Sequence, residues 1–384
     1  MHIILFDDKP SALTPFTLMM PSWDVPLGGS TLREVLKVWF PHAALEEHFG
    51  PFHPTLAHGA SALAISGRLL PSQALYHSLQ QAMEGGRPMR ALIDDEVAYA
   101  VVVPNEAGLQ EHMAATGDGV TLLRMPWDII KHLDKTLQLS VSFKSRVLSE
   151  IQPGVFIGEG VTLPPYLITR TENGPIVIGA HTQIGSFSVL EGPLVVGERC
   201  VIRDHSAIAA SAIGHVSKVG GEIEHSVIDA YSNKQHHGFV GHSIVGSWVN
   251  IGAGACTSNL KHTYGTVRVD RGFGKEETGT QFCGCFIGES SRVSINANLM
   301  AGAVLGVSTF VIGMAHGFIP SFTAVTPRGM VEIPFDTAWR ARQRAMARRG
   351  MSPSVTERDR FATLYERTTA DRAMRGVRSG PIQL

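Results

Sequence analysis

The sequence predicts three successive parts: an α/β domain over residues 1–150, a parallel β-helix over residues 151–330, and a helical tail over residues 331–384. Helix-type and strand-type patterns alternate in the first part, which is typical of a layered α/β domain. In the second part, aliphatic residues recur at every sixth position, a period of neither an α-helix nor a simple two-faced strand. The third part is rich in arginine and has a helical pattern.

The elements of the first part follow from local patterns. The apolar run at residues 3–6 predicts a β-strand. Thr31 and Glu34 have the spacing of a capping box and predict a helix over about 31–40. A second helix is expected over about 72–83, ended by Gly85-Gly86. We also expect a buried strand over 97–103, ended by Pro104, and a helix over about 127–139.

The repeat of the second part opens with six aliphatic residues in phase: Ile178, Ile184, Leu190, Val196, Ile202 and Ile208. The spacing restarts at three later points: Ile213 and Val219; Phe239, Val245 and Ile251; and Ile287, Val293, Leu299, Leu305 and Val311. Each unit predicts a short strand and a corner, with one aliphatic side chain pointing inward. Three units close one triangular coil, and coils stacked at about 4.8 Å bury their equivalent side chains on one another.

Two segments depart from the repeat. Residues 256–282 are polar and glycine-rich, and they predict a loop that projects from the stacked coils. The tail from residue 331 holds 11 arginines against 6 acidic residues, with helical patterns over 339–348 and 356–375. We expect amphipathic helices packed on the coils or on a neighbouring subunit; a phosphate-binding or partner-docking arm is the alternative.

Composition excludes several classes. The 384 residues are 44% hydrophobic and carry a formal net charge of −1, so the chain lacks the basic field that nucleic acid binding needs. Four cysteines are too few for a disulfide framework. The apolar start ends at Asp7-Asp8, too short for an export signal or a membrane span. We therefore expect a cytoplasmic protein with no membrane partner.

Motifs in both halves resemble one family. The second half contains residues 231–242, Tyr-Ser-Asn-Lys-Gln-His-His-Gly-Phe-Val-Gly-His, followed by Val-Asn-Ile-Gly-Ala-Gly at 249–254 and Ser-Asn-Leu-Lys at 258–261. The first half contains Ile-Leu-Phe-Asp-Asp at 4–8 and Gly-Gly-Ser-Thr-Leu-Arg-Glu at 28–34. These segments resemble the GlmU-like bifunctional enzymes, which acetylate glucosamine 1-phosphate and uridylate the product for cell-envelope polysaccharide. The resemblance implies a left-handed β-helix, a homotrimer with sites between subunits, and acetyl-CoA as co-substrate.

The resemblance also assigns roles to residues. A histidine of those enzymes acts as general base on the sugar amine, and an asparagine 23 residues later lines the acceptor site; here they match His236 and Asn259. An imidazole suits the task because it can accept the proton released when an amine attacks a thioester. Further substrate-binding candidates are Lys218, Glu222, Asn233, Lys234 and Lys261. The sequence therefore predicts CoA-dependent acyl transfer to an amino sugar phosphate or nucleotide sugar.

Two departures concern the acceptor. Leu260 stands where the family has a tyrosine, and Glu224 where a lysine helps to hold the sugar phosphate. Phosphate binding must then come from Arg203, Lys218, Lys234 or Lys261, unless the acceptor differs.

The first part supports an alternative function, sugar-1-phosphate nucleotidyl transfer with the β-helix as an oligomerisation or regulatory scaffold. The glycine-rich phosphate loop of that family is replaced by Asp7-Asp8-Lys9-Pro10, and the domain is shorter than the complete form. Asp7, Asp8, Ser30, Thr31 and Arg33 are the candidate phosphate or nucleotide ligands, because a helix N-terminus favours phosphate. Mg²⁺ is expected only if this domain is active, and Asp94-Asp95 is a further pair of acids that suits a metal.

The histidines allow one rival interpretation. γ-Type carbonic anhydrases are β-helix proteins that bind zinc with three histidines across a subunit interface, a role that His205, His237 and His242 could fill. The surrounding motif follows the acyltransferase pattern instead, so we expect no metal site.

Overall fold

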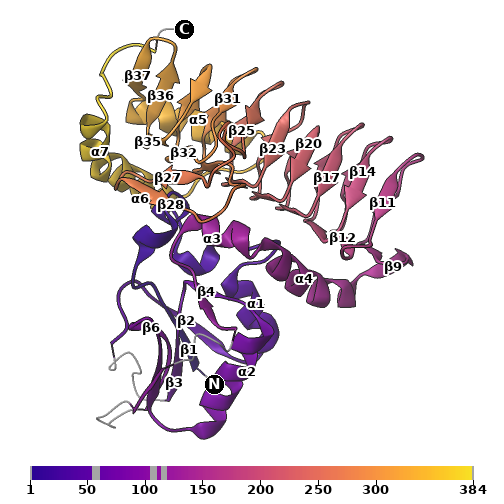
Figure 1. Ribbon diagram of the computed structural model, residues 1–384, viewed down its shortest axis with the longest axis vertical. Coiled ribbons are helices and arrows are strands. Elements are labelled where there is room, and N and C mark those ends of the chain that lie inside the picture. Colours follow the sequence, from indigo (N-terminus) through magenta and orange to yellow (C-terminus); the bar gives the residue numbers. More distant parts are fainter. Residues whose placement is uncertain (1, 54–60, 104–109, 114–118, 383–384) are drawn as a thin grey trace. The chain divides into compact units, whose positions relative to one another are not determined.

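The computed structural model describes residues 2–53, 61–103, 110–113 and 119–382. The chain folds as two compact units, Met1–Leu139 and Ser140–Leu384 (Figure 1). The predicted fold class is confirmed: an α/β region precedes a parallel β-helix, and helices follow it. The division between units falls inside helix α4 (Leu133–Lys144) rather than at residue 150, and the tail belongs to the second unit.

The first unit is built on a mixed six-stranded sheet in the order β2-β1-β3-β6-β5-β7. The pairs β1–β2, β1–β3 and β5–β7 are parallel, whereas β3–β6 and β5–β6 are antiparallel. The strands are β1 (His2–Phe6), β2 (Ala44–His48), β3 (Ala62–Ser66), β5 (Met89–Ile93), β6 (Glu96–Val102) and β7 (Gln110–Met113), and β4 (Leu69–Leu70) pairs with β8 (Thr121–Leu122) in a separate sheet.

The helices of the first unit lie close to their predicted ranges. Helix α1 (Leu32–Trp39) begins with the expected capping box, in which Thr31 Oγ1 accepts from the Glu34 N–H at 3.2 Å. Helix α2 (Gln73–Gly85) is capped by Ser72 and ends at the left-handed Gly86. The single helix expected over 127–139 is two helices, α3 (Pro126–Lys131) and α4, which meet at His132. Strand β6 ends at Val102, and Pro104 lies outside the described residues.

The β-helix has three faces, which we call A, B and C (Figure 1). Face A contains β9 (Ser149–Gln152), β10 (Val155–Ile157), β12 (Ile176–Ile178), β15 (Leu194–Val196), β18 (Ala212–Ile213), β21 (Val227–Ile228), β24 (Ile244–Val245), β29 (Phe286–Ile287), β32 (Val304–Leu305) and β35 (Phe318–Ile319). Face B contains β13 (Gln183–Ile184), β16 (Val201–Ile202), β19 (Lys218–Val219), β22 (Asn233–Lys234), β25 (Asn250–Ile251), β30 (Arg292–Val293), β33 (Phe310–Val311), β36 (Thr323–Thr326) and β37 (Gly329–Glu332). Face C contains β11 (Ile168–Arg170), β14 (Val189–Glu191), β17 (Ala207–Ala209), β20 (Glu222–Glu224) and β23 (Phe239–Gly241), and then β26 (Cys256–Thr257), β31 (Asn298–Leu299) and β34 (Met314–Ala315).

The six-residue repeat sets the register of the coils. Ile178 pairs with Val196, Ile184 with Ile202, and Leu190 with Ile208, each one coil apart on its own face. These side chains belong to one continuous apolar core along the coil axis. One phase was misassigned: Val240 points into the core at 1% exposure, and Phe239 faces outward. The reason is that the preceding inward position is occupied by Lys234, so the row of aliphatic residues is interrupted there.

The corners between faces contain residues in the left-handed region, many of which are not glycine. Tyr231 (φ 62°) and Trp248 (φ 59°) stand on the corner between faces A and B, the A–B corner. Their rings stack at 4.4 Å with an interplanar angle of 2°. Side chains of successive coils thus pack on each other outside the coil as well as inside it, which offsets the cost of the strained backbone.

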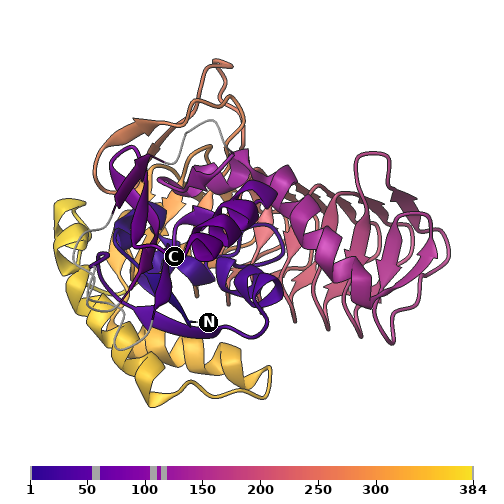
Figure 2. The same ribbon diagram turned by 90° about the horizontal axis from the view of Figure 1, so that it is seen from below.

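The projecting loop contains more structure than the sequence indicates. Cys256 and Thr257 still form strand β26 of the coil, paired with β31. The chain then leaves the coil and returns at β29, with a hairpin of β27 (Arg268–Asp270) and β28 (Lys275–Glu277) between. Figure 2 shows this hairpin projecting from the coils.

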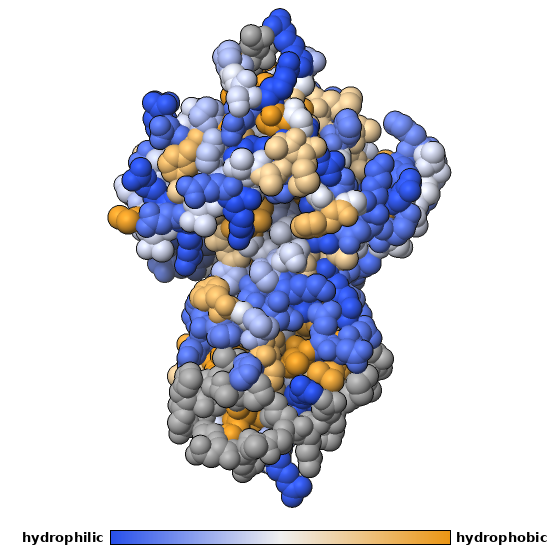
Figure 3. Space-filling model, turned by 90° about the vertical axis from the view of Figure 1, so that its left-hand side faces the viewer, coloured by the Kyte–Doolittle hydropathy of each residue, from blue (hydrophilic) through white to orange (hydrophobic). Residues whose placement is uncertain are grey.

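The tail forms helices α5 (Phe335–Ala347), α6 (Val355–Arg367) and α7 (Thr369–Met374), which lie along the stacked coils (Figure 2). Phe361 packs on Phe322 of the last coil at 4.9 Å and on Trp339 of α5 at 5.7 Å. Arg342 of α5 is buried; it donates to the Glu289 carboxylate and, at 2.8 Å, to Ser290 Oγ. The face that carries α6 and α7 is mostly hydrophilic (Figure 3), as expected when α6 buries Phe361 and Leu364 on its other side.

Candidate functional site

His236 lies at the corner between faces B and C, the B–C corner, in the coil formed by residues 227–243. Its side chain is exposed. The equivalent corner of the preceding coil is short, because only Gly220 and Gly221 separate β19 from β20, whereas residues 235–238 separate β22 from β23. The corner that carries His236 therefore extends further than the corner before it.

Lys234 is the one lysine on the inner side of face B in the described coils. The inward positions of neighbouring coils hold Ile202, Val219 and, beyond Lys234, Ile251, so the row is otherwise aliphatic. Its side chain is 2% exposed. The ammonium donates to the carbonyls of Gly220 (2.9 Å), His236 (2.6 Å) and Gly238 (3.0 Å).

These contacts correct the prediction that Lys234 binds substrate. An ammonium has three N–H donors, and all three are used by backbone carbonyls. Burial lowers the pKa of Lys234 to about 8, which leaves it mainly protonated at neutral pH. Its place in the structure is to hold the short corner and the His236 corner together.

Lys218 and Asn233 lie on the outer side of face B. Lys218 pairs in register with Asn233, and Asn233 with Asn250. Arg349, which follows α5, donates from Nη2 to Asn233 Oδ1 at 2.9 Å. Burial, followed by the charges of Arg349, Arg203 and Arg348, lowers the pKa of Lys218. Of these neighbours, only Arg203 was a candidate from the sequence.

Asn259 lies at the corner between faces C and A, the C–A corner, where it contacts His242. Its Nδ2 is 3.0 Å from Nδ1 of His242. The His242 ring stacks between His225 (4.8 Å) and Phe282 (5.4 Å). Burial, and then the neighbouring His225, lowers the pKa of His242 to about 4, so this imidazole is neutral at physiological pH.

The remaining candidates lie on face C and in the projecting loop. Glu222 is exposed at the start of β20 on face C, where it pairs with Phe239. Lys261 lies in the projecting loop and donates to the Thr266 carbonyl at 2.7 Å. The structure thus distributes the predicted set over face B, the B–C corner, and the C–A corner with its loop.

In the first unit, the candidate acids are already bonded. Asp7 accepts from Ser22 Oγ at 2.7 Å and from the Ser22 N–H at 3.1 Å, and burial raises its pKa. Asp8 accepts from Arg68 Nη2 at 2.6 Å. Arg68 is fully buried and also contacts Glu96. Its guanidinium therefore neutralises Asp8, which follows β1, together with Glu96 of β6.

The predicted phosphate group at α1 is likewise unavailable. Thr31 caps the helix, and the Glu34 carboxylate accepts from the Thr31 N–H at 2.9 Å, where a phosphate would bind. Arg33 pairs with Asp24 at 2.6 Å and with Glu47 at 2.7 Å. The Ser30 hydroxyl is buried without a hydrogen-bond partner in the part of the chain that the structure describes.

These contacts do not fit Mg²⁺. A magnesium site needs free carboxylates, and those of Asp7 and Asp8 serve Ser22 and Arg68. Asp94 pairs with Arg124 at 2.9 Å. Among the described residues, no three histidine, cysteine or acidic side chains are grouped so as to hold a metal ion. The histidines of the zinc interpretation occupy different places: His205 stacks on Phe187 at 5.2 Å, and His242 lies at the C–A corner.

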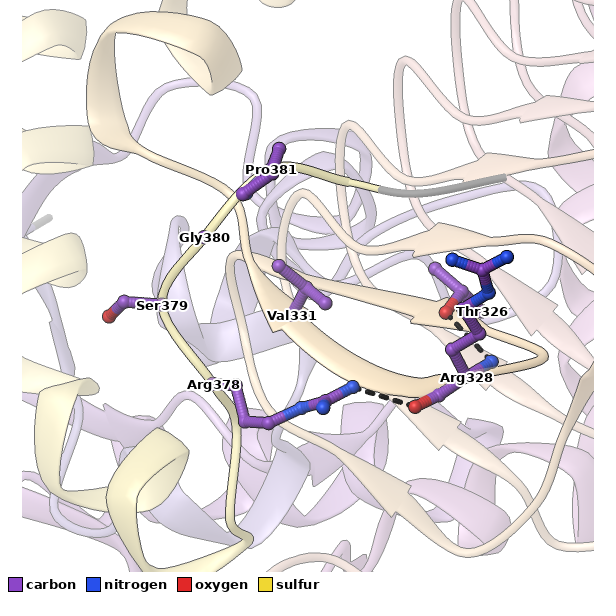
Figure 4. A pocket seen from close by; sticks show the side chains of 7 residues that line it. All are labelled: Thr326, Arg328, Val331, Arg378, Ser379, Gly380 and Pro381. Carbon is purple, nitrogen blue, oxygen red and sulfur yellow. Dashed lines mark hydrogen bonds between the residues drawn. The ribbon is translucent and has the colours of Figure 1, made fainter.

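Two hollows are found on the second unit. One, of about 200 Å³, lies between the β36–β37 hairpin and the C-terminal segment, where Arg378 donates to the Arg328 carbonyl at 2.7 Å (Figure 4). None of the predicted site residues lines it. The other, of about 190 Å³, lies on face B and includes Asn233. No helix in the described ranges is long and apolar enough to span a bilayer.

Comparison with known proteins adds relatives to both units. Residues 3–146 match the family model of sugar nucleotidyl transferases. The chain is 32% identical over 154 residues to the putative uncharacterized acetyltransferase YaiX of Escherichia coli K12, which covers 39% of this chain and 67% of that protein. It is 28% identical over 158 residues to the bifunctional protein GlmU of Herminiimonas arsenicoxydans, covering 40% of this chain and 31% of that protein.

The chain spans about a third of the length of the GlmU proteins that it matches. Among solved structures, the UDP-N-acetylglucosamine acyltransferase of Francisella novicida has a TM-score of 0.33 and 14% identity, covering 61% of this chain and 94% of that one. The match to two thirds of YaiX and the nucleotidyl transferase match at the N-terminus show the family. The chain belongs to the GlmU-like family with a hexapeptide-repeat acyltransferase domain.

Proposed function

We propose that this protein transfers an acyl group from a CoA thioester to the amino group of a small sugar substrate, with His236 as the general base. The observation that supports this most directly is the His236 corner. It places an imidazole in solvent, at a corner that is two residues longer than the Gly220-Gly221 corner of the preceding coil.

The reaction requires little more than a base and a positioned thioester. The sugar amine attacks the thioester carbonyl, a C–N bond forms, and His236 accepts the proton that the amine loses. The C–S bond then breaks, and the proton passes to the departing thiolate, which leaves as free CoA. Backbone N–H groups at a coil corner would stabilise the oxyanion of the intermediate.

Acyl transfer is tested by following free CoA release across a panel of amino sugars, their 1-phosphates and nucleotide sugars. We expect His236→Ala to lower kcat/KM by about 10²–10⁴-fold, the usual contribution of a general base. Because His236 is exposed, the thermal midpoint should not change. The matched control is His237→Ala, its exposed neighbour. Undiminished transfer by His236→Ala would refute the assignment of the base.

The N-terminal match to sugar nucleotidyl transferases supports a second candidate, nucleotidyl transfer to a sugar 1-phosphate. The Asp8–Arg68–Glu96 contacts count against it, because they use the acids that such a reaction needs. A parallel arm of the same assay measures pyrophosphate release from nucleoside triphosphates with Mg²⁺. Turnover in this arm without CoA-dependent transfer would favour the second candidate.

We further propose a homotrimer with sites between subunits. Three exposed apolar side chains support an interface at the N-terminal end of the coils: Tyr166 (71%), Phe187 (54%) and Ile168 (52%). Tyr166 and Phe187 stack at 4.9 Å, so they present one apolar surface.

A further inference from the structure

The outer side of face B carries a cluster of cations, and none of them forms an ion pair within the described residues. The members are Arg203, Lys218, Arg292, Arg348 and Arg349, which come from three strands or their adjacent corners and from the end of α5. Two buried arginines of the second unit are paired with acids: Arg342 contacts Glu289 and Glu357, and Arg372 contacts Glu332. The cluster differs from these two because it gathers several cations without such acids.

The cations of this cluster repel one another. Burial and then Arg348 lower the pKa of Arg349. Arg292 is a separate case: burial, and then Arg342 outside the cluster, lower its pKa to about 10, and its Nη1 donates to the carbonyls of Trp248, Ser290 and Ser291. Burial and three neighbouring arginines lower the pKa of Lys218, and no acidic residue offsets them. Like charges gathered without counter-charges destabilise the empty protein, so a ligand that supplies negative charge would be bound favourably.

A hollow of about 190 Å³ lies within this cluster. Arg292 and Arg349 line it together with the amides of Asn233 and Asn250, and the edges of Tyr231 and Trp248 form a wall at the A–B corner. The Nε of Arg349 is buried there and has no hydrogen-bond partner in the part of the chain that the structure describes. Buried donors are normally bonded, so this N–H lacks an acceptor that a ligand would provide.

The pocket depends on the position of α5, which buried contacts with the coils determine. Arg342 of α5, seven residues before Arg349, is buried against Glu289 and Ser290 of the coil. This contact directs the end of α5 onto face B, where Arg349 bonds Asn233. The pocket therefore needs both the repeat and the tail.

From these observations we infer that the pocket between face B and the end of α5 binds a phosphate or diphosphate group of a small-molecule ligand. The pocket is smaller than the roughly 300–1,000 Å³ of sites that enclose a whole ligand, so it fits one charged group of a larger molecule. Arginine and amide side chains are the usual partners of phosphate oxygens. In the aromatic wall, Tyr231 and Trp248 already stack on each other, and Tyr231 also contacts His215 at 4.9 Å.

The pocket lies on the same face that leads to His236. Asn233 precedes His236 by three residues, an extended distance of about 10 Å. If the proposed acyl transfer holds, the bound phosphate belongs either to the CoA donor or to a sugar phosphate. The pocket itself does not depend on that proposal, because its binding is measured without turnover.

The test compares two variants of the whole protein with the same loss of charge, one within α5 and one just after its end. Arg349→Gln removes the unpartnered donor, whereas Arg344→Gln removes an exposed arginine that has no ion pair in the described residues. Inorganic pyrophosphate is titrated by calorimetry in low salt. We expect Arg349→Gln to weaken pyrophosphate binding by about tenfold or more, the value of one charge-assisted hydrogen bond, and Arg344→Gln to leave it unchanged.

A thermal readout separates binding from folding. Without ligand, Arg349→Gln should melt at or above the wild-type temperature, since it relieves repulsion; a structural arginine would lower the midpoint. Two further pairs identify the source: CoA against 3′-dephospho-CoA, and glucosamine 1-phosphate against glucosamine. A phosphate-dependent loss in either pair for Arg349→Gln supports the site.

Two results would overturn the inference. One is wild-type protein that binds none of these phosphates, or binds them equally well in both variants. The other is an Arg349→Gln variant that changes only the oligomeric state, which would mean that an acidic surface of a second copy occupies the pocket.

Discussion

Lys234 occupies a position that is aliphatic in the neighbouring coils of face B. Its ammonium donates to three carbonyls, and within the described residues only the Gly238 carbonyl accepts from a second donor, the Glu222 N–H at 3.1 Å. A neutral side chain of similar volume would fill the space but leave the carbonyls of Gly220 and His236 without this donor. Lys234 is therefore a positioning residue for the His236 corner.

We predict that Lys234→Met lowers the free energy of unfolding by about 2 kcal/mol or more, because buried carbonyls lose their donor. Urea unfolding measures the loss, and hydrogen exchange at residues 235–238 should accelerate more than exchange on face A. Lys218→Met, on the outer side of the adjacent strand, is the matched control. A Lys234→Met variant as stable as wild type would show that the ammonium contributes nothing net.

His242 links stability to pH. Its pKa is lowered to about 4 in the folded protein from an ordinary value of 6.5, so between these values the unfolded chain binds the extra proton. Stability contributed by His242 is therefore present above pH 6.5 and is lost as the pH falls towards 4. The loss amounts to about 3 kcal/mol, at 1.36 kcal/mol per pKa unit.

The corresponding variant is His242→Phe, which keeps a ring between His225 and Phe282. Phenylalanine adopts the same left-handed backbone at Phe187 and Phe322 in this fold. Denaturant midpoints from pH 4 to 7 should fall less steeply for His242→Phe than for wild type, whereas His262→Gln, an exposed histidine, should follow wild type. Parallel curves for His242→Phe and wild type would contradict the assignment.

At the scale of elements, local signals predicted what local forces determine. The capping box at Thr31 and Glu34 identified the start of α1, and Ser72 with Gly85-Gly86 bracketed α2. The same residues were also predicted to bind phosphate, but the Thr31 and Glu34 groups that a phosphate would need already cap the helix. A cap and an anion site share one sequence signature, and only the contacts distinguish them.

The repeat was predicted wherever its inward residue is aliphatic, and lost where it is not. Lys234 interrupts the aliphatic row, so the phase was resumed at Phe239 instead of Val240. The tail helices were also visible as patterns, but the docking of Arg342 on Glu289 joins residues 53 positions apart. No sequence spacing could indicate that Arg349 reaches Asn233, 116 residues earlier.

On the scale of the molecule, the β-helix is stabilised by contacts between neighbouring coils. Face A alone runs through ten strands, from β9 to β35. The candidate site residues of the second unit accordingly come from adjacent coils and from the tail that packs beside these coils. The candidate base was found from the family motif, whereas its supporting lysine and the arginine pocket became visible only in three dimensions.

The proposed trimer predicts the mass of the protein in solution. Light scattering should give three chain masses for the wild-type protein, and Phe187→Glu should reduce the mass to one chain by placing a charge in the apolar surface near Tyr166. Phe273→Glu changes an even more exposed phenylalanine, in the projecting loop, and should remain trimeric. A wild-type monomer, or equal effects of both changes, would argue against this interface.

Under the proposed acyl transfer from CoA thioesters, the enclosed amine of Lys234 has a chemical consequence. Such compounds acylate free amines without a catalyst, and a lysine whose pKa is about 8 presents a larger unprotonated fraction than an ordinary one. Its nitrogen escapes this side reaction because three oxygens and the coil wall surround it. Acylation of the Lys234 nitrogen would therefore show that the His236 corner had opened while a thioester was present.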